Sequence, residues 1–190
     1  MRQPAFASVV PMAVPEAPFR ETKFGLVADV EGWFVLNARE SRWRDYGPMG
    51  FNCNFEGKRR FPQLGINVNV LPRGASLGLY HSEAHQEDFF VLAGECVLVV
   101  EGETRPLRAW DFVHCPAGTP HIIVGVGDEP AVVVAVGARG GRRGLRYLVD
   151  PAARELGVSV ETETTKPDEA YASFPHPTRT SYRDGWLPDF

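Results

Sequence analysis

The stretch between residues 24 and 138 consists of short apolar runs that Gly and Pro interrupt every few residues. The run at 64–71, LGINVNVL, alternates apolar and polar side chains, which is the period of a half-buried strand. The sequence EGET at 101–104 is typical of a hairpin turn, and Gly94 separates two apolar runs. No segment of this region has a helical period of useful length. The pattern predicts an all-β barrel or sandwich.

The segments that flank this region have a different character. DPAARELG at 150–157 has Asp150 as a candidate N-cap, a Pro in the first turn and a Gly at the stop, and DEAYASF at 168–174 predicts a second short helix. The sequence therefore predicts three parts: a flexible leader rich in Pro and Ala at 1–18, a β-barrel with added N-terminal strands at 19–138, and a C-terminal extension with short helices at 139–190.

Composition excludes several classes of protein. A chain of 190 residues with 44% hydrophobic residues suits one domain with extensions. The net charge of −4 gives no overall basic field, so we expect no nucleic-acid partner. No run of 18 apolar residues occurs, so we expect no membrane span. Three cysteines without a CxxC pair, and an N-terminus interrupted by Pro, favour a soluble cytoplasmic protein.

Residues 80–95, YHSEAHQEDFFVLAGE, concentrate ionisable side chains directly before an apolar run. His81 and Glu83 are two apart, so on a strand they would share a face, and Glu87 would begin the next strand. His121 follows a Pro-Gly turn far downstream, and antiparallel strands can bring it beside the first group. Two imidazoles with one or two carboxylates at one point would bind a divalent transition metal.

The spacing within this stretch matches a known motif. His81, one residue, Glu83, three residues, Glu87, six residues and Gly94 follow a pattern in which His-x-His precedes a Glu and a Gly. Glu83 stands where the pattern has its second His. In this respect the segment resembles the cupins, small β-barrels whose metal site is encoded in two sequence motifs.

The second cupin motif runs from a Gly through Pro-x-Gly to a His and an Asn. Here Trp110, five residues, Pro116-Ala-Gly118, two residues, His121, three residues and Gly125 follow the same spacing. Trp110 replaces the leading Gly, and Gly125 replaces the Asn. The two motifs together cover residues 80–125, and the surrounding strands extend the similarity to roughly 60–138.

The resemblance implies a jelly-roll barrel, the cupin double-stranded β-helix, with an N-terminal arm and a short helical C-terminal tail. Carried over residue by residue, the implied metal ligands are His81, Glu83, Glu87 and His121. His85 is an alternative to Glu83, because the chain turns a corner between 81 and 87 and its register is open there. Such a ligand set suits Fe, Mn, Ni or Zn.

Cupin resemblance also implies a small-molecule ligand, and two classes of function stay open. One is a metal-dependent enzyme of the dioxygenase or isomerase type, for which His85, His114 and Tyr80 are candidate proton-transfer groups. The other is a non-catalytic ligand-binding or sensing barrel, and a variant of it has lost its metal. Long arms on a small barrel, and the need to cover strand edges, lead us to expect a homodimer.

Overall fold

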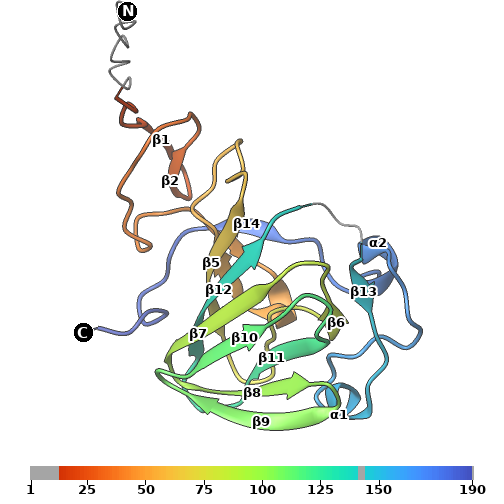
Figure 1. Cartoon of the computed structure of the whole chain (residues 1–190). Coiled ribbons are helices and arrows are strands. Elements are labelled where there is room, and N and C mark those ends of the chain that lie inside the picture. Colours follow the sequence, from red (N-terminus) through yellow and green to blue (C-terminus); the bar gives the residue numbers. More distant parts are fainter. Residues whose placement is uncertain (1–12, 141–143, 190) are drawn as a thin grey trace, which may run out of the picture.

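Two antiparallel sheets facing one another form the body of the protein in a computed structural model that describes residues 13–140 and 144–189 (Figure 1). The all-β barrel expected from the sequence is confirmed. The first twelve residues of the predicted leader lie outside the described residues. No helix in the described ranges is long and apolar enough to cross a membrane.

The larger sheet has seven strands. Their order is β10 (Phe112–Cys115), β7 (Glu87–Ala93), β12 (Ala131–Ala138), β5 (Leu64–Leu71), β4 (Phe51–Cys53), β3 (Trp43–Asp45) and β14 (Thr178–Thr180). The strand from the C-terminal extension therefore completes one edge of the sheet, and β10 forms the other edge.

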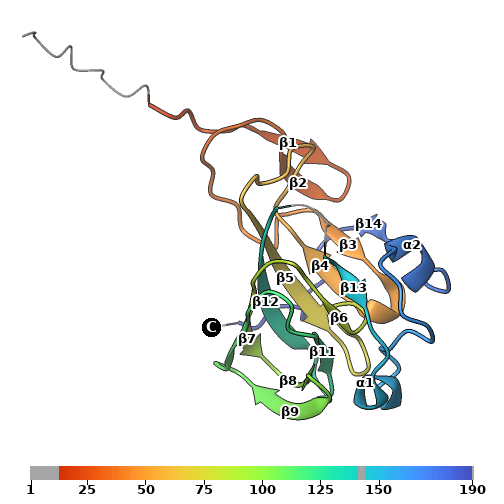
Figure 2. The ribbon, with the colours of Figure 1, turned by 45° about the vertical axis from the view of Figure 1, so that its right-hand side comes forward.

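The smaller sheet has five strands. Their order is β13 (Arg146–Tyr147), β6 (His81–Ser82), β11 (His121–Gly125), β8 (Glu95–Val100) and β9 (Glu103–Arg108). A separate hairpin of β1 (Phe19–Thr22) and β2 (Gly25–Ala28) lies beyond one end of the two sheets in both views (Figures 1 and 2).

Helical turns are short and lie beside the barrel (Figure 2). They are η1 (Gly47–Met49), α1 (Pro151–Glu155) and α2 (Pro167–Ala170). The capping prediction for α1 is confirmed, because the side chain of Asp150 accepts a hydrogen bond of 2.8 Å from the backbone N–H of Ala153. The second predicted helix forms over fewer residues than the 168–174 expected, since it ends at Ala170.

The main core fills the space between the two sheets. It contains eleven buried side chains, among them Leu71, Val91, Ile123 and Val133, each no more than 1% exposed. These residues come from strands of both sheets, so their burial holds the two layers together. The ends of the strands beyond this core are free to carry polar groups.

The alternation in β5 has an unexpected orientation. Its apolar residues Val68 and Val70 pack outward, against a second cluster that includes Trp43 and Trp186. Its polar residues, Asn67 and Asn69, face the interior between the sheets. The C-terminal segment that carries Trp186 makes this inversion stable, because it covers the outer apolar face of the sheet.

Trp110 occupies a backbone conformation that favours Gly. Its φ is 77°, in the left-handed region, where the resemblance places a Gly. Its side chain is 68% exposed, and its ring meets the Phe90 ring edge-on at 5.8 Å between centroids. The turn before β10 therefore carries local backbone strain that the side chain does not offset by burial.

Candidate metal centre

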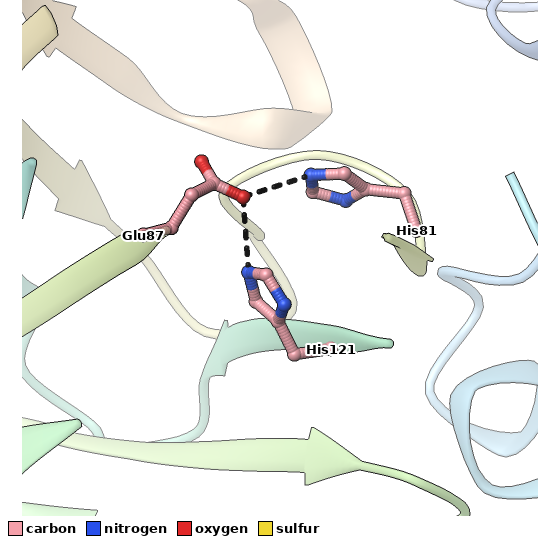
Figure 3. A group of neighbouring side chains, drawn as sticks. All are labelled: His81, Glu87 and His121. Atoms are coloured by element: carbon pink, nitrogen blue, oxygen red, sulfur yellow. Dashed lines mark ion pairs between the residues drawn. The ribbon is translucent and has the colours of Figure 1, made fainter. Parts of the chain in front are cut away.

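Three ionisable side chains from three strands converge inside the barrel (Figure 3). His81 begins β6, Glu87 begins β7, and His121 begins β11. His81 and His121 are direct cross-strand partners, which places both imidazoles on one side of the smaller sheet. One ligand atom from each of the three residues lies within 4.8 Å of the other two.

The carboxylate of Glu87 lies between the two imidazoles. Its Oε2 atom is 3.6 Å from His81 Nε2 and 3.4 Å from His121 Nε2. Both separations exceed those of a charge-assisted hydrogen bond, about 2.8 Å. Neighbouring ligand atoms around one ion with metal–ligand bonds of about 2.1 Å lie about 3.0–3.5 Å apart. The separation from His121 falls within this range, and the separation from His81 is slightly above it.

Two of these atoms are buried without a hydrogen-bond partner. Within residues 13–140 and 144–189, Glu87 Oε2 and His121 Nε2 are the only buried side-chain polar atoms left unsatisfied. Burying an unpaired polar atom costs free energy, so such atoms are rare in folded proteins. A cation held between them would remove this cost, and the residues present therefore fit a divalent metal.

Backbone carbonyls fix the orientation of both imidazoles. His81 Nδ1 lies 2.7 Å from the carbonyl oxygen of Leu79, and His121 Nδ1 lies 2.9 Å from that of Thr119. A carbonyl oxygen can only accept, so each Nδ1–H donates, and in the neutral imidazole Nε2 is the nitrogen that carries the lone pair. Both Nε2 atoms face the carboxylate of Glu87, which is the arrangement of metal-ligating histidines.

The charges at this centre shift two pKa values in opposite directions. Burial alone would raise the pKa of Glu87, but His121 and His81 outweigh it and lower this pKa to about 2. Burial alone would lower the pKa of His121, but Cys115, Glu87 and Thr119 raise it to about 10. Without an ion, the protein therefore holds a proton on His121 to balance the charge of Glu87.

Glu83 lies near this centre but outside the group of three. It is half-buried, and burial followed by the charge of Glu87 raises the pKa of its carboxyl. Its backbone carbonyl accepts a hydrogen bond of 2.7 Å from Gly118 N–H in the Pro-Ala-Gly turn. The alternative residue, His85, packs its ring against the backbone of Gly140 and is not in the group either.

The other proton-transfer candidates lie away from the centre. His114 is on the opposite face of the larger sheet, where its Nδ1 lies 2.7 Å from Asp88 Oδ1. Tyr80 is 3% exposed and packs with Val99 and Ile122 in a separate apolar cluster. Neither of them lines the cavity at the metal centre.

A cavity of about 690 Å³ opens beside the three residues. Sequence reasoning missed most of its other polar lining, which comes from the larger sheet and from the C-terminal extension: Asn52, Asn54, Asn67, Asn69, Asp168 and His176. The alternation of Asn and Val in INVNV was the available signal, although it does not tell which face of the strand lies inside.

Tyr171 joins the C-terminal extension to the metal centre. Its hydroxyl accepts a hydrogen bond of 3.2 Å from the backbone N–H of Leu79. The carbonyl of that same residue accepts from His81. Tyr171 also lines the cavity, and its burial raises the pKa of its phenol. The backbone of one residue, Leu79, thus bonds to the C-terminal extension through its N–H and to a candidate ligand through its C=O.

Comparison with known proteins agrees with the barrel and the motifs. Residues 67–137 match the family model described as Cupin domain. This part of the chain is a cupin domain. The domain contains all three converging residues and the whole of β5, β7 and β11 apart from the first three residues of β5. The cupin assignment made from the two motifs is confirmed.

Three known proteins are similar to parts of this chain. An oxalate-binding protein of Thermotoga maritima is 33% identical over 66 residues, which are 35% of this chain and 54% of that protein. A sugar phosphate isomerase of the cupin superfamily from Silicibacter pomeroyi is 28% identical, over 54% of this chain and 62% of its own, with a TM-score of 0.43. KdgF from a Halomonas species is 25% identical, over 52% and 88%, with a TM-score of 0.44. The chain spans about half the length of its curated relative.

Proposed function

We propose that this cupin binds one divalent transition metal through His81, Glu87 and His121 and acts as a metal-dependent enzyme on a small organic molecule. The observation that carries the proposal is the unsatisfied pair of buried atoms, Glu87 Oε2 and His121 Nε2, at a spacing suited to one ion. Two imidazoles and one carboxylate are the ligand types that Fe, Mn, Ni and Zn accept.

All three residues line the cavity. Three protein ligands would leave a bound ion with coordination positions for a substrate, as in catalytic rather than structural sites. A bound ion would supply Lewis-acid activation of a carbonyl or enolate, or a site that binds substrate together with dioxygen. The chain's own residues hold the imidazoles through Leu79 and Thr119 and keep the carboxylate of Glu87 ionised. Isomerase and dioxygenase chemistry are both compatible with this arrangement.

A non-catalytic ligand-binding barrel is the second candidate. Its support is the similarity to a protein named for binding oxalate rather than for a reaction. The same three residues would then serve to hold a ligand through a metal. A turnover assay with metal-loaded protein separates the two candidates, because a binding protein would return its ligand unchanged.

Elemental analysis tests the metal proposal directly. Protein is purified without chelator or added metal, as wild type, His121→Ala, Glu87→Gln and the control His114→Ala, which removes an imidazole on the opposite face of the sheet. We expect close to one equivalent of metal in the wild type and in the control, and none in the other two variants. Glu87→Gln keeps the side-chain volume, so it separates loss of a ligand from loss of the fold. A metal-free wild type would overturn the proposal.

A homodimer is a further part of the proposal. The edge strand β10 carries Phe112, which is 62% exposed, next to Trp110 in the preceding turn. Phe90 is the cross-strand partner of Phe112, so these rings form one apolar surface at the edge of the sheet. A second copy packed there would cover both the exposed rings and the unpaired edge.

A further inference from the structure

A row of amide side chains lines the cavity on the larger sheet. Asn67 and Asn69 are two residues apart on β5 and face inward, and Asn52 on β4 is the direct cross-strand partner of Asn69. Asn side chains are uncommon in strand interiors, where they cost stability unless they are hydrogen-bonded. Their presence on the inner face therefore suggests that they bind a polar ligand.

Hydrogen bonds fix the orientation of two of these amides. Asn69 donates from Nδ2 to the carbonyl of Val133 at 3.2 Å, and a carbonyl can only accept. Asn69 Oδ1 therefore accepts, and it does so from Asn52 Nδ2 at 2.8 Å. These two hydrogen bonds fix the amide of Asn52, and its Oδ1 atom is an acceptor that has no donor in the described part of the protein. A ligand at this point must supply a donor.

Asn67 has a free amide. No group in residues 13–140 or 144–189 makes a hydrogen bond with its side chain, and the residue is only partly buried. It lines the same cavity as the metal centre, so both its N–H donors and its carbonyl acceptor are available to a ligand. A hydroxyl group, which donates and accepts, matches both Asn67 and Asn52.

The floor between the amides and the metal centre is made of small residues. Ala135 on β12 lies between Asn67 and Phe89, and Gly137 lies between Gly65 and Glu87. Two strand spacings, about 10 Å, separate the backbones of β7 and β5. Side chains projecting from either side shorten that gap, so a molecule of five or six carbons can reach from Glu87 to the amides.

The charge of the cavity argues against an anion at the amide end. Among its described lining residues there is no Lys or Arg, and Asp168 adds a carboxylate at the rim. The nearest cation along the row, Arg44, pairs across the sheet with Asn52 but does not line the cavity. A phosphate held away from the metal would face the fixed acceptor of Asn52 without a Lys or Arg from the described cavity lining.

We infer that the ligand is an uncharged polyhydroxylated carbonyl compound, such as a free pentose or hexose, and not a sugar phosphate or a dicarboxylate. Its hydroxyl groups bond to Asn67 and to Asn52 Oδ1, and its carbonyl end lies at His81, Glu87 and His121. Only the placement of the carbonyl end at the three candidate ligands rests on the proposed function. The amide end stands on the hydrogen-bond pattern of β4 and β5.

Binding can be measured without turnover. Saturation-transfer NMR and calorimetry are run on metal-loaded and on chelator-treated protein. The ligands are D-xylose, D-glucose and D-fructose, the esters of these sugars with phosphate on the terminal hydroxyl, and oxalate. The variants are Asn67→Leu and Asn67→Asp, with Gln63→Met as a control that removes an exposed amide outside the cavity. Metal content and thermal unfolding are measured on each variant, so a change in the fold or in the centre is seen separately.

We expect at least one free sugar to bind, and Asn67→Leu to weaken it by about tenfold with metal content unchanged. Asn67→Asp keeps the shape and an acceptor but loses the donors, so it weakens binding as well. Tighter binding of the phosphates or of oxalate than of the free sugars would overturn the inference while leaving the metal proposal intact. Binding of a free sugar that depends on Asn67 in a metal-free wild type would support the inference and overturn the proposed function. If none of the free sugars binds, the inference about the ligand is overturned.

Discussion

The Oε2 atom of Glu87 lies 3.4 Å from the Nε2 atom of His121, and both atoms are buried without a hydrogen-bond partner in the described part of the chain. This separation is too long for a strong hydrogen bond and is suited to two ligands of one ion. The relationship therefore supports the proposed metal centre over an ordinary buried ion pair, and it leads to predictions about ligands, protons and stability.

Substitutions at Glu83, His85 and Glu87, in and just before the first residue of β7, should differ in their effect on metal affinity. We expect Glu87→Gln to reduce affinity more than a hundredfold, because it replaces an anionic carboxylate ligand with a neutral amide, and Glu83→Ala to reduce it about tenfold through loss of a neighbouring charge. We expect His85→Ala to leave affinity unchanged, because that ring packs against Gly140. Competition with a metal-binding dye measures all three. A larger effect for His85 than for Glu83 would show that the register of the loop differs from the one described.

Metal affinity should rise with pH. The pKa of His121 in the ion-free protein is about 10, so at neutral pH an entering ion must displace its proton. We expect the apparent affinity to increase by about tenfold for each pH unit between 7 and 9, with release of about one proton. Calorimetry in buffers of different ionisation enthalpy counts the released protons, and affinity independent of pH over this range would contradict the assignment.

The stability of the ion-free protein should have the opposite dependence in the alkaline range. His121 has a pKa raised from 6.5 to about 10, so its contribution is full below pH 6.5 and is lost as the pH rises through about 10. Glu87 has a pKa lowered from 4.5 to about 2, so its contribution is full above pH 4.5 and is lost as the pH falls through about 2. We expect urea unfolding of chelated protein to show a maximum between these limits, which His121→Ala flattens.

The left-handed backbone at Trp110 should favour Gly over any other small residue. Both Trp110→Gly and Trp110→Ala lose the contact with Phe90, so comparing them isolates the backbone strain. We expect the Gly variant to be more stable than the Ala variant by about 1 kcal/mol. At Phe112, inside β10, the same pair should show the reverse order. Chemical denaturation measures both pairs, and Ala above Gly at position 110 would refute the strain.

The homodimer stays a prediction that light scattering can decide. We expect wild-type protein to run as a dimer at micromolar concentration, and Phe112→Lys to shift it toward the monomer, because the change places a charge in the exposed apolar surface of β10. Gln63→Met, a change at a distant exposed residue, should have no effect. A wild type that is monomeric at every concentration would show the expectation to be wrong.

Local sequence patterns predicted the features that depend on local geometry. Strand periods and the Asp150 cap are properties of neighbouring residues, so they could be predicted before the structure was known. The set His81, Glu83, Glu87 and His121 was predicted instead from the resemblance of two motifs to the cupins, and three of these residues converge. Which face of β5 lies inside the barrel could not be predicted in this way. Alternation shows that one face is apolar, but whether it lies inside depends on Trp186, more than a hundred residues away.

The position of Glu83 shows a second limit. The strand that carries His81 ends at Ser82, so the alternation that would place residue 83 beside residue 81 does not continue. The contribution of the C-terminal extension was equally hidden, because nothing in the sequence around Tyr171 points to Leu79. Contacts between segments distant in sequence decide both positions.

The hydrogen bond from Leu79 to Tyr171 changes where the working unit of this protein ends. The segment recognised as a cupin domain stops at residue 137 and contains all three candidate ligands, yet Leu79, whose carbonyl orients the ring of His81, bonds through its own N–H to a phenol beyond that boundary. A barrel cut at residue 137 would keep all three candidate ligands but would lose the hydrogen bond from Leu79 to Tyr171. Anyone who transplants, truncates or swaps this domain should therefore carry the tail along with it.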